Sequence, residues 1–112
     1  MKFMIHLLTI TLFFLGTGLA TAREYPEAPS FSLETAEGAD LDLPDEQQGT
    51  GIYLFWASWC PYCRALMPHL QSLEDEYGDG LTVYALNFRD QQDPAEYLDE
   101  RGFDFVLLPK AD

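Results

Sequence analysis

The chain has 112 residues, of which 47% are hydrophobic and 14% aromatic. This composition excludes a disordered or low-complexity chain, and the length allows one small domain but not several packed together. Six basic residues against 19 acidic ones give a formal net charge of −13, which opposes binding to nucleic acid or anionic lipid, because both select clusters of Lys and Arg.

The first 22 residues have the pattern of a signal peptide. Lys2 precedes an apolar run over residues 3–15, small residues follow, and Ala20-Thr21-Ala22 fits the cleavage site of signal peptidase. Cleavage there leaves a mature domain of residues 23–112. The alternative is an uncleaved anchor, since residues 3–22 are about long enough to cross a bilayer. In both cases residues 23–112 are expected to be exported to a compartment where disulfides persist. A membrane is a partner only if the leader stays attached.

Two β elements are predicted before the first cysteine. Residues 23–30 are polar, contain two prolines and predict an extended lead-in. Apolar and polar residues alternate on both sides of a Glu37-Gly38 turn, so residues 31–43 predict a short amphipathic hairpin. Residues 44–51 predict a loop or a single helical turn. The unbroken apolar run IYLFWA at residues 52–57 is typical of a central strand covered on both faces.

A helix is predicted over residues 61–77. Its apolar residues recur at steps of four, three and four, and glycines follow directly after it. The residues in this pattern are Leu66, Leu70, Leu73 and Tyr77. Pro68 lies inside the helix and is expected to kink it, because proline lacks the backbone N–H group.

The remaining residues predict two further strands around a second helix. Residues 81–88 (LTVYALNF) predict a buried strand, and residues 103–108 (FDFVLL) predict another. Between them, Asp93-Pro94 begins a helix that continues through Arg101 and ends at Gly102. Strands that alternate with helices indicate parallel βαβ crossovers, so the predicted class is an α/β sandwich.

Both cysteines lie in Cys60-Pro61-Tyr62-Cys63, between a predicted strand and the start of a predicted helix. Free N–H groups and the helix dipole stabilise an anion at that position, so the pKa of the Cys60 thiol is expected to fall below about 8.5. Cys60 would then attack a sulfur of a partner molecule to form a mixed disulfide, and Cys63 would resolve that disulfide. Pro61 suits the first helical turn, where no N–H is needed.

The cysteine pair also allows three roles without redox chemistry. A structural disulfide is one, although so small a loop constrains the unfolded chain little. Metal binding is another, but zinc usually needs four ligands, His6 leaves with the leader, and His69 is expected on the far side of the helix. Two unpaired core cysteines are the third, and these would not be expected to fall together at a strand-to-helix junction.

Residues 55–70, FWASWCPYCRALMPHL, resemble the active-site segment of thioredoxin-fold proteins. The resemblance is strongest to the exported branch that includes the TlpA-, ResA- and cytochrome c maturation-type thiol-disulfide oxidoreductases. The hairpin is similar to that branch's N-terminal extension, and FDFVLL resembles a strand that the branch inserts. The resemblance covers residues 29–112 and implies a thioredoxin-like α/β fold, with an N-terminal hairpin followed by βαβαβ.

The resemblance also implies residue roles. Cys60 is the implied nucleophile, Cys63 the resolving cysteine and Trp59 a flanking surface aromatic. Trp56 and Phe55 are expected in the core, because they extend the apolar run of the strand. Pro68 matches the family's kinking proline.

The function implied is that of a thiol-disulfide oxidoreductase acting on exported proteins, in the bacterial periplasm or at the outer face of the inner membrane. Its partners would be protein thiol or disulfide substrates and an upstream redox protein, with no bound cofactor or metal. The likeness favours a reductase over an oxidase, although the Pro61-Tyr62 dipeptide, typical of glutaredoxins, leaves the redox direction open. The alternative is a non-catalytic remnant or binding module.

Two departures from the family pattern stand out. Leu54 occupies the place where many thioredoxins keep a buried acid. The family also continues with a helix, a strand that begins with a cis-proline, a further strand and a last helix, and the 112 residues supply none of these. The sequence is therefore expected to be a front portion of the fold, with one edge of the strand at residues 52–57 unpaired.

The remaining charged residues carry less chemistry. An acidic cluster at the end of the first helix is expected to be solvated rather than to bind a metal; it comprises Glu74, Asp75, Glu76 and Asp79. The carboxylate pairs Asp90/Asp93 and Asp99-Glu100 lack an accompanying nucleophile or histidine, so hydrolase chemistry has little support. Arg64 could steady a thiolate or be solvated.

Overall fold

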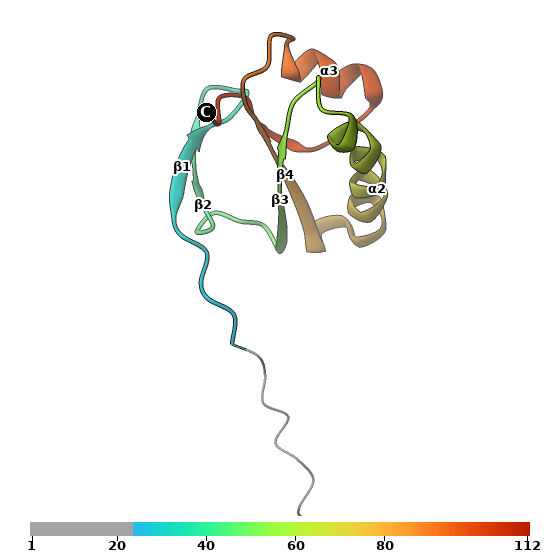
Figure 1. Ribbon diagram of the computed structural model, residues 1–112. Helices are drawn as coiled ribbons and strands as arrows, with labels where there is room; N and C mark the ends of the chain where they lie inside the picture. The colour runs from blue at the N-terminus through green and yellow to red at the C-terminus, as the bar shows by residue number, and fades with distance from the viewer. Residues whose placement is uncertain (1–23) are drawn as a thin grey trace, which may run out of the picture.

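The computed structural model describes residues 24–112, which form a hairpin, a parallel sheet and two α-helices (Figure 1). The predicted leader and its cleavage site lie outside the described residues. Within residues 24–112, no helix is both long enough and apolar enough to cross a membrane. The elements in chain order are β1 (Phe31–Glu34), β2 (Asp40–Leu43), β3 (Thr50–Trp56), α2 (Pro61–Tyr77), the short 3-10 helix η2 (Gly78–Gly80), β4 (Leu81–Asn87), α3 (Pro94–Arg101) and β5 (Val106–Leu108).

The main sheet has the strand order β3-β4-β5, and both of its strand pairs are parallel. Helix α2 connects β3 to β4 and helix α3 connects β4 to β5, whereas β1 and β2 pair with each other in an antiparallel hairpin. The predicted hairpin followed by βαβαβ is therefore confirmed. Within residues 24–112, β3 pairs with β4 alone, so its other edge is unpaired, as expected from the sequence.

The two faces of the sheet pack against different layers. Along β4, Val83 and Ala85 belong to the core shared with α2 and α3, whereas Tyr84 and Leu86 belong to the core on the hairpin side. This alternation follows from the two-residue period of a strand. Figure 1 shows the hairpin on one side of the sheet and α2 on the other. Coverage of β4 on both faces agrees with the apolar run at residues 83–86 in its sequence.

Local signals place the ends of both helices where they were predicted. Cys60 precedes α2 and Pro61 is its first residue. The Asp93 carboxylate caps α3 by accepting the backbone N–H groups of Ala95 and Glu96, at 2.9 and 3.3 Å. Gly102 ends the helix with a φ of 71°, in the left-handed region that favours glycine.

The strand boundaries and the buried face of α2 differ from the prediction. Strand β3 begins at Thr50 rather than at residue 52, and the last strand is shortened to Val106–Leu108. Of the four apolar residues that predicted α2, Leu70 is buried and the other three are exposed. The face toward the sheet instead carries Cys63, Met67 and Leu70, a row with the same spacing but rotated around the helix. The spacing of apolar residues predicts the helix, but two rows of residues on it have that spacing, so the spacing does not determine which row faces the sheet.

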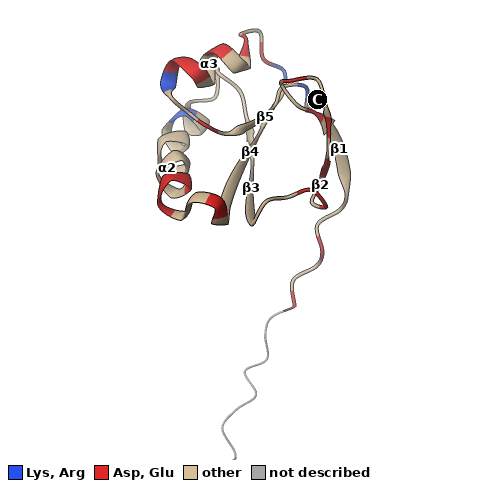
Figure 2. Cartoon of the chain, turned by 180° about the vertical axis from the view of Figure 1, so that it is seen from behind, with Lys and Arg blue, Asp and Glu red and all other residues tan. Residues whose placement is uncertain are grey.

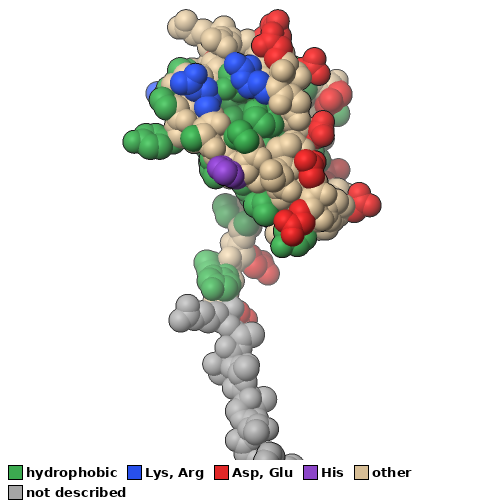
Figure 3. Space-filling model, turned by 90° about the vertical axis from the view of Figure 1, so that its right-hand side faces the viewer, with side chains coloured by type: hydrophobic (Ala, Val, Ile, Leu, Met, Phe, Trp, Pro, Cys, Tyr) green, Lys and Arg blue, Asp and Glu red, His purple; other side chains and the backbone are tan. Residues whose placement is uncertain are grey.

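Exposed apolar side chains therefore occupy the outer surface of α2. Tyr62 is 88% exposed, Leu66 45% and Tyr77 61%. Figure 3 shows hydrophobic side chains on this face of the molecule, with Lys and Arg near them and acidic side chains along one side. The acidic residues lie mainly along α3, at the end of α2 and on the hairpin (Figure 2).

Candidate active site

The two cysteines form a disulfide at the junction between β3 and α2. Their Cα atoms are 5.3 Å apart, within the range that a disulfide requires. Cys60 is the N-cap residue of α2 and has an extended backbone conformation, while Cys63 lies in the first helical turn. The pair is therefore located at the helix N-terminus, as the sequence predicted.

The backbone directs Cys60 toward the free N–H groups of the helix. Cys60 N–H donates to the Ala57 carbonyl at 3.1 Å, which closes a tight turn after β3. The Cys63 N–H group points at Cys60 Sγ, with a nitrogen to sulfur distance of 3.3 Å. In the reduced protein this N–H group and the helix dipole would stabilise a Cys60 thiolate.

The surroundings of the two sulfurs differ. Both cysteines are partly buried, but Cys63 packs against the core between the sheet and the helices. Cys63 Sγ lies 3.7 Å from the Phe55 carbonyl oxygen. Trp59, directly before Cys60, is 58% exposed, in agreement with its expected position as a surface aromatic. Cys60 therefore directly follows an exposed aromatic residue, whereas Cys63 is in contact with the core.

Phe55 was expected in the core, and this expectation is wrong. Phe55 is 62% exposed, whereas its neighbour Trp56 is fully buried. Leu54 and Trp56 face the helices, so the pleat of β3 turns Phe55 to the opposite face. There Tyr53 is covered by the hairpin, but Phe55 lies beyond it and borders an open hollow with Phe88.

The sequence did not indicate that Asp90 would reach the active-site turn. Its carboxylate accepts hydrogen bonds from both the backbone N–H and the hydroxyl of Ser58, each at 2.6 Å. Asn87 Nδ2 and the Gln92 N–H also donate to it, at 3.0 and 3.1 Å. Burial raises the pKa of Asp90, but these hydrogen bonds outweigh the burial and lower the pKa to about 2. The hydrogen bond from Gln92 joins residues two apart and is a local contact. Ser58, however, is 32 residues from Asp90 in sequence, so neighbouring residues give no indication of that contact.

The acidic cluster is only partly as expected. Glu74 is partly buried, and its carboxylate accepts the Val83 N–H at 2.7 Å. Burial raises the pKa of Glu74, the Val83 hydrogen bond opposes the rise, and the nearby Asp104 and Asp75 add to it. Glu74 therefore joins α2 to the sheet rather than extending freely into solvent.

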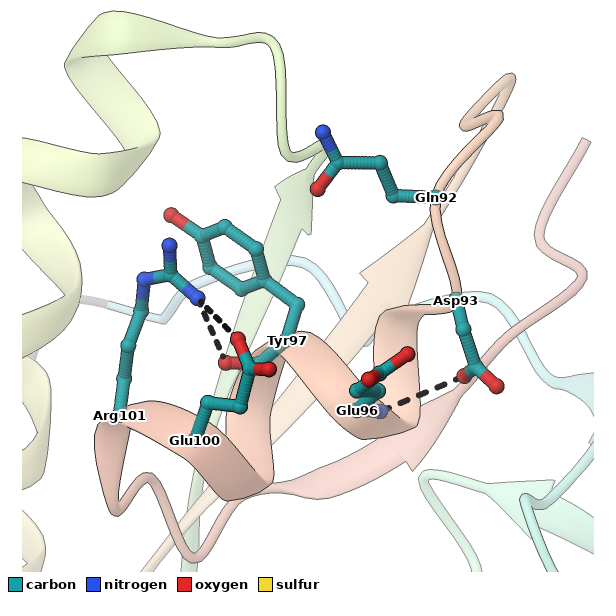
Figure 4. A pocket seen from close by; sticks show the side chains of 6 residues that line it. All are labelled: Gln92, Asp93, Glu96, Tyr97, Glu100 and Arg101. Atoms are coloured by element: carbon teal, nitrogen blue, oxygen red, sulfur yellow. Dashed lines mark hydrogen bonds and ion pairs between the residues drawn. The ribbon is translucent and has the colours of Figure 1, made fainter.

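The remaining polar residues singled out in the sequence lie on α2 and α3 or near the ends of these helices, in the part of the chain that the structure describes. No group of three or more His, Cys, Asp or Glu side chains within residues 24–112 is arranged to hold a metal ion. His69 and Arg64 are exposed on α2. Figure 4 shows a pocket along α3, where the Arg101 guanidinium lies 3.6 Å from the centre of the Tyr97 ring. This pocket is lined by neither cysteine.

Curated relatives of this chain carry redox names. Thiol-disulfide oxidoreductase ResA of Halalkalibacterium halodurans is 34% identical over 99 residues, which cover 86% of this chain and 54% of that protein. Sporulation thiol-disulfide oxidoreductase A of Bacillus subtilis is 37% identical over 90 residues, which cover 73% of this chain and 54% of that protein. The chain spans about half the length of these curated relatives.

Solved structures and a family model agree with these relatives. A thiol:disulfide interchange protein DsbE from Chlorobium tepidum superimposes with a TM-score of 0.66 at 26% identity, covering 81% of this chain and 65% of that one. This similarity confirms the predicted thioredoxin-like fold. Residues 26–111 match the model described as the AhpC/TSA family. Because that match covers most of the sequence, the chain belongs to the AhpC/TSA family.

Proposed function

We propose that this protein is a thiol-disulfide oxidoreductase that exchanges dithiols and disulfides on exported proteins, with a preference for reduction. The observation that carries the proposal is the Cys60–Cys63 disulfide, with Cys60 as the N-cap of α2. The relatives named as thiol-disulfide oxidoreductases support it. Since the chain spans about half of their length, the activity, substrates and partners are inferred for this chain.

The proposed reaction transfers two electrons through the cysteine pair. The reduced Cys60 thiolate attacks one sulfur of a substrate disulfide, forms a mixed disulfide and expels the other substrate sulfur as a thiolate, which takes up a proton. Cys63 loses its proton and attacks Cys60 Sγ, which releases the second substrate thiol. The substrate is then a dithiol, and the pair is the disulfide seen in the structure. An upstream dithiol protein would return the two electrons.

Cys60 is proposed as the nucleophile because of its position in the helix. Its sulfur faces the Cys63 N–H group, and the residue directly follows the exposed Trp59 in sequence, whereas Cys63 packs against the core. A protein substrate therefore has easier access to Cys60. The exported location is proposed from the leader pattern of residues 1–22, which leaves residues 23–112 as the redox domain.

The test compares the protein with two matched variants, Cys60→Ser and Cys63→Ser, in insulin reduction by dithiothreitol. We expect the unaltered protein to accelerate insulin precipitation and both variants to lose the acceleration. The Cys63→Ser variant should still trap a mixed disulfide with a substrate, whereas Cys60→Ser should not. Equal rates for the unaltered protein and Cys60→Ser would refute the proposed enzyme and favour the non-catalytic module.

The preference for reduction has a separate test. The potential of the Cys60/Cys63 couple is measured by equilibration in glutathione buffers. Thioredoxin-like pairs span about 150 mV, and we expect this couple toward the thioredoxin end, at about −270 mV. A value near that of the strong oxidant DsbA, about −120 mV, would overturn the preference.

A further inference from the structure

We propose that Asp90 is a positioning residue, whose carboxylate holds the turn before α2 so that Cys60 Sγ stays aligned with the helix N-terminus. This inference rests on the proposed function, because it concerns the reactivity of Cys60. Asp90 lies after β4 and contacts neither cysteine by a hydrogen bond; it acts through Ser58, two residues before Cys60.

The carboxylate is fully engaged in holding that turn. Oδ2 accepts the Ser58 N–H and Asn87 Nδ2, while Oδ1 accepts the Ser58 hydroxyl and the Gln92 N–H. Ser58 is 7% exposed and Asn87 is 2% exposed. A buried N–H or hydroxyl that loses its acceptor is costly, so the segment has little freedom to move away from Asp90.

Neighbouring residues of the same loop bind the same turn. The Arg89 carbonyl accepts Trp59 Nε1 at 3.0 Å, and the Phe88 N–H donates to the Trp56 carbonyl at 3.3 Å. Arg89 has a φ of 45°, a strained conformation for a residue other than glycine. Strain of this kind persists where the surrounding contacts over-determine the backbone, and it is concentrated at functional sites. The contacts on either side of Arg89 provide that restraint.

The turn transmits this restraint to the reactive sulfur. Cys60 N–H donates to the Ala57 carbonyl, so the residues on both sides of Ser58 belong to one closed turn. The same turn places Cys60 Sγ 3.3 Å from the Cys63 nitrogen. If the turn loosens, Sγ spends less time at the helix N-terminus, the thiolate loses stabilisation and the pKa of Cys60 rises.

A positioning role and a purely electrostatic role predict opposite signs. As a nearby negative charge alone, Asp90 would disfavour the Cys60 thiolate, and its removal would lower the pKa of Cys60. As a positioning residue, its removal raises that pKa. The Asp90→Asn variant distinguishes them because asparagine keeps the size of the side chain but removes the charge and one acceptor oxygen.

The test measures alkylation of Cys60 by iodoacetamide as a function of pH in the reduced protein, with the modified peptide identified by mass spectrometry. We expect Asp90→Asn to raise the pKa of Cys60 and to slow alkylation at pH 7 by about three- to tenfold. Ser58→Ala, which keeps the carboxylate, should act in the same direction with a smaller effect. The double variant should fall short of the sum of the two, because both remove the same hydrogen bond.

Asp93→Asn is the matched control. It removes a carboxylate from the same loop, but Asp93 caps α3, where asparagine is an equally good cap. We expect it to leave the pKa of Cys60 unchanged. An unchanged or lowered pKa in Asp90→Asn, or an equal shift in Asp93→Asn, would overturn the proposal. If Asp90→Asn does not fold, Ser58→Ala decides, and an unchanged pKa there overturns it.

These outcomes are distinct from a failure of the proposed function. If Cys60 of the unaltered protein is alkylated no faster than an ordinary peptide thiol, the activated nucleophile is refuted. If the unaltered protein reacts fast and the Asp90 and Ser58 variants react equally fast, the role of Asp90 alone is refuted.

Discussion

The hydrogen bonds around Asp90 predict a pH-dependent contribution to stability. We consider Asp90→Asn, measured by urea unfolding. The pKa of Asp90 is lowered from 3.8 to about 2, because the donors from Ser58, Asn87 and Gln92 outweigh the effect of burial. A group with a lowered folded-state pKa stabilises the fold above its unfolded pKa, and this stabilisation is lost as the pH falls toward the folded pKa.

The size of the effect follows from the same values. A lowering from 3.8 to about 2 corresponds to about 2.5 kcal/mol, since one pKa unit is worth about 1.4 kcal/mol. Asp90 is only partly buried, and solvent screening reduces the expected contribution to about 1–2 kcal/mol. We therefore expect Asp90→Asn to lower the free energy of unfolding by this amount at pH 7 and by progressively less below pH 3.8, where the carboxyl takes up a proton in the unfolded chain but not yet in the folded one.

The assay follows tryptophan fluorescence during urea unfolding at pH 7, 5, 3 and 2, with Asp93→Asn as the control. Trp56 is fully buried, so its emission reports loss of the core. The difference between the unaltered protein and Asp90→Asn should shrink as the pH falls from 4 to 2. A difference that is constant with pH, or absent at pH 7, would contradict the role assigned to the four hydrogen bonds.

Three further predictions concern stability. Met67→Ala should lower the free energy of unfolding by about 2–5 kcal/mol, because Met67 is fully buried in the core between α2 and the sheet; Met67→Leu should cost less than about 1.5 kcal/mol, and equal effects in urea unfolding would argue against this packing. Burial and the nearby acids raise the pKa of Glu74 in spite of its hydrogen bond from Val83. The fold therefore favours the protonated side chain, and the stabilisation that this form provides is lost as the pH rises through the folded pKa. Glu74→Gln should therefore make the free energy of unfolding depend less on pH above about pH 4.5, the ordinary pKa region of glutamate. Urea unfolding at several pH values measures this, and a pH dependence equal to that of the unaltered protein would refute it. Gly49→Ala should destabilise, since the φ of Gly49 is 61° and an added Cβ would lie 2.7 Å from the Gly80 carbonyl oxygen; a melting temperature equal to that of the unaltered protein would contradict this.

Signals that act over a few residues made much of the fold predictable. The positions of Pro61, Asp93 and Gly102 mark helix ends because capping depends on groups within one helical turn. The hairpin at residues 31–43 follows from alternation and a turn. The Cys60-Pro61-Tyr62-Cys63 segment indicated a redox pair for the same reason: its spacing and its place before a helix are both visible along the chain.

Contacts between distant segments were not predictable from such signals. Phe55 and Trp56 belong to one apolar run, and the register of β3 against β4 and the limited reach of the hairpin decide that Trp56 is buried and Phe55 exposed. In the same way, two rows of apolar residues on α2 have equivalent spacing, and packing on the sheet selects the row with Met67 and Leu70.

Asp90 shows the same limit in the site itself. Its partner Ser58 precedes α2, and the two residues meet because parallel pairing places the ends of β3 and β4 side by side, with Trp56 opposite Asn87. Caps, turns and the cysteine spacing are written in neighbouring residues, since their energies depend on short stretches of backbone. Which faces are covered, and which carboxylate holds the turn before Cys60, depends on pairing across the sheet, where the contacting groups are about 30 residues apart.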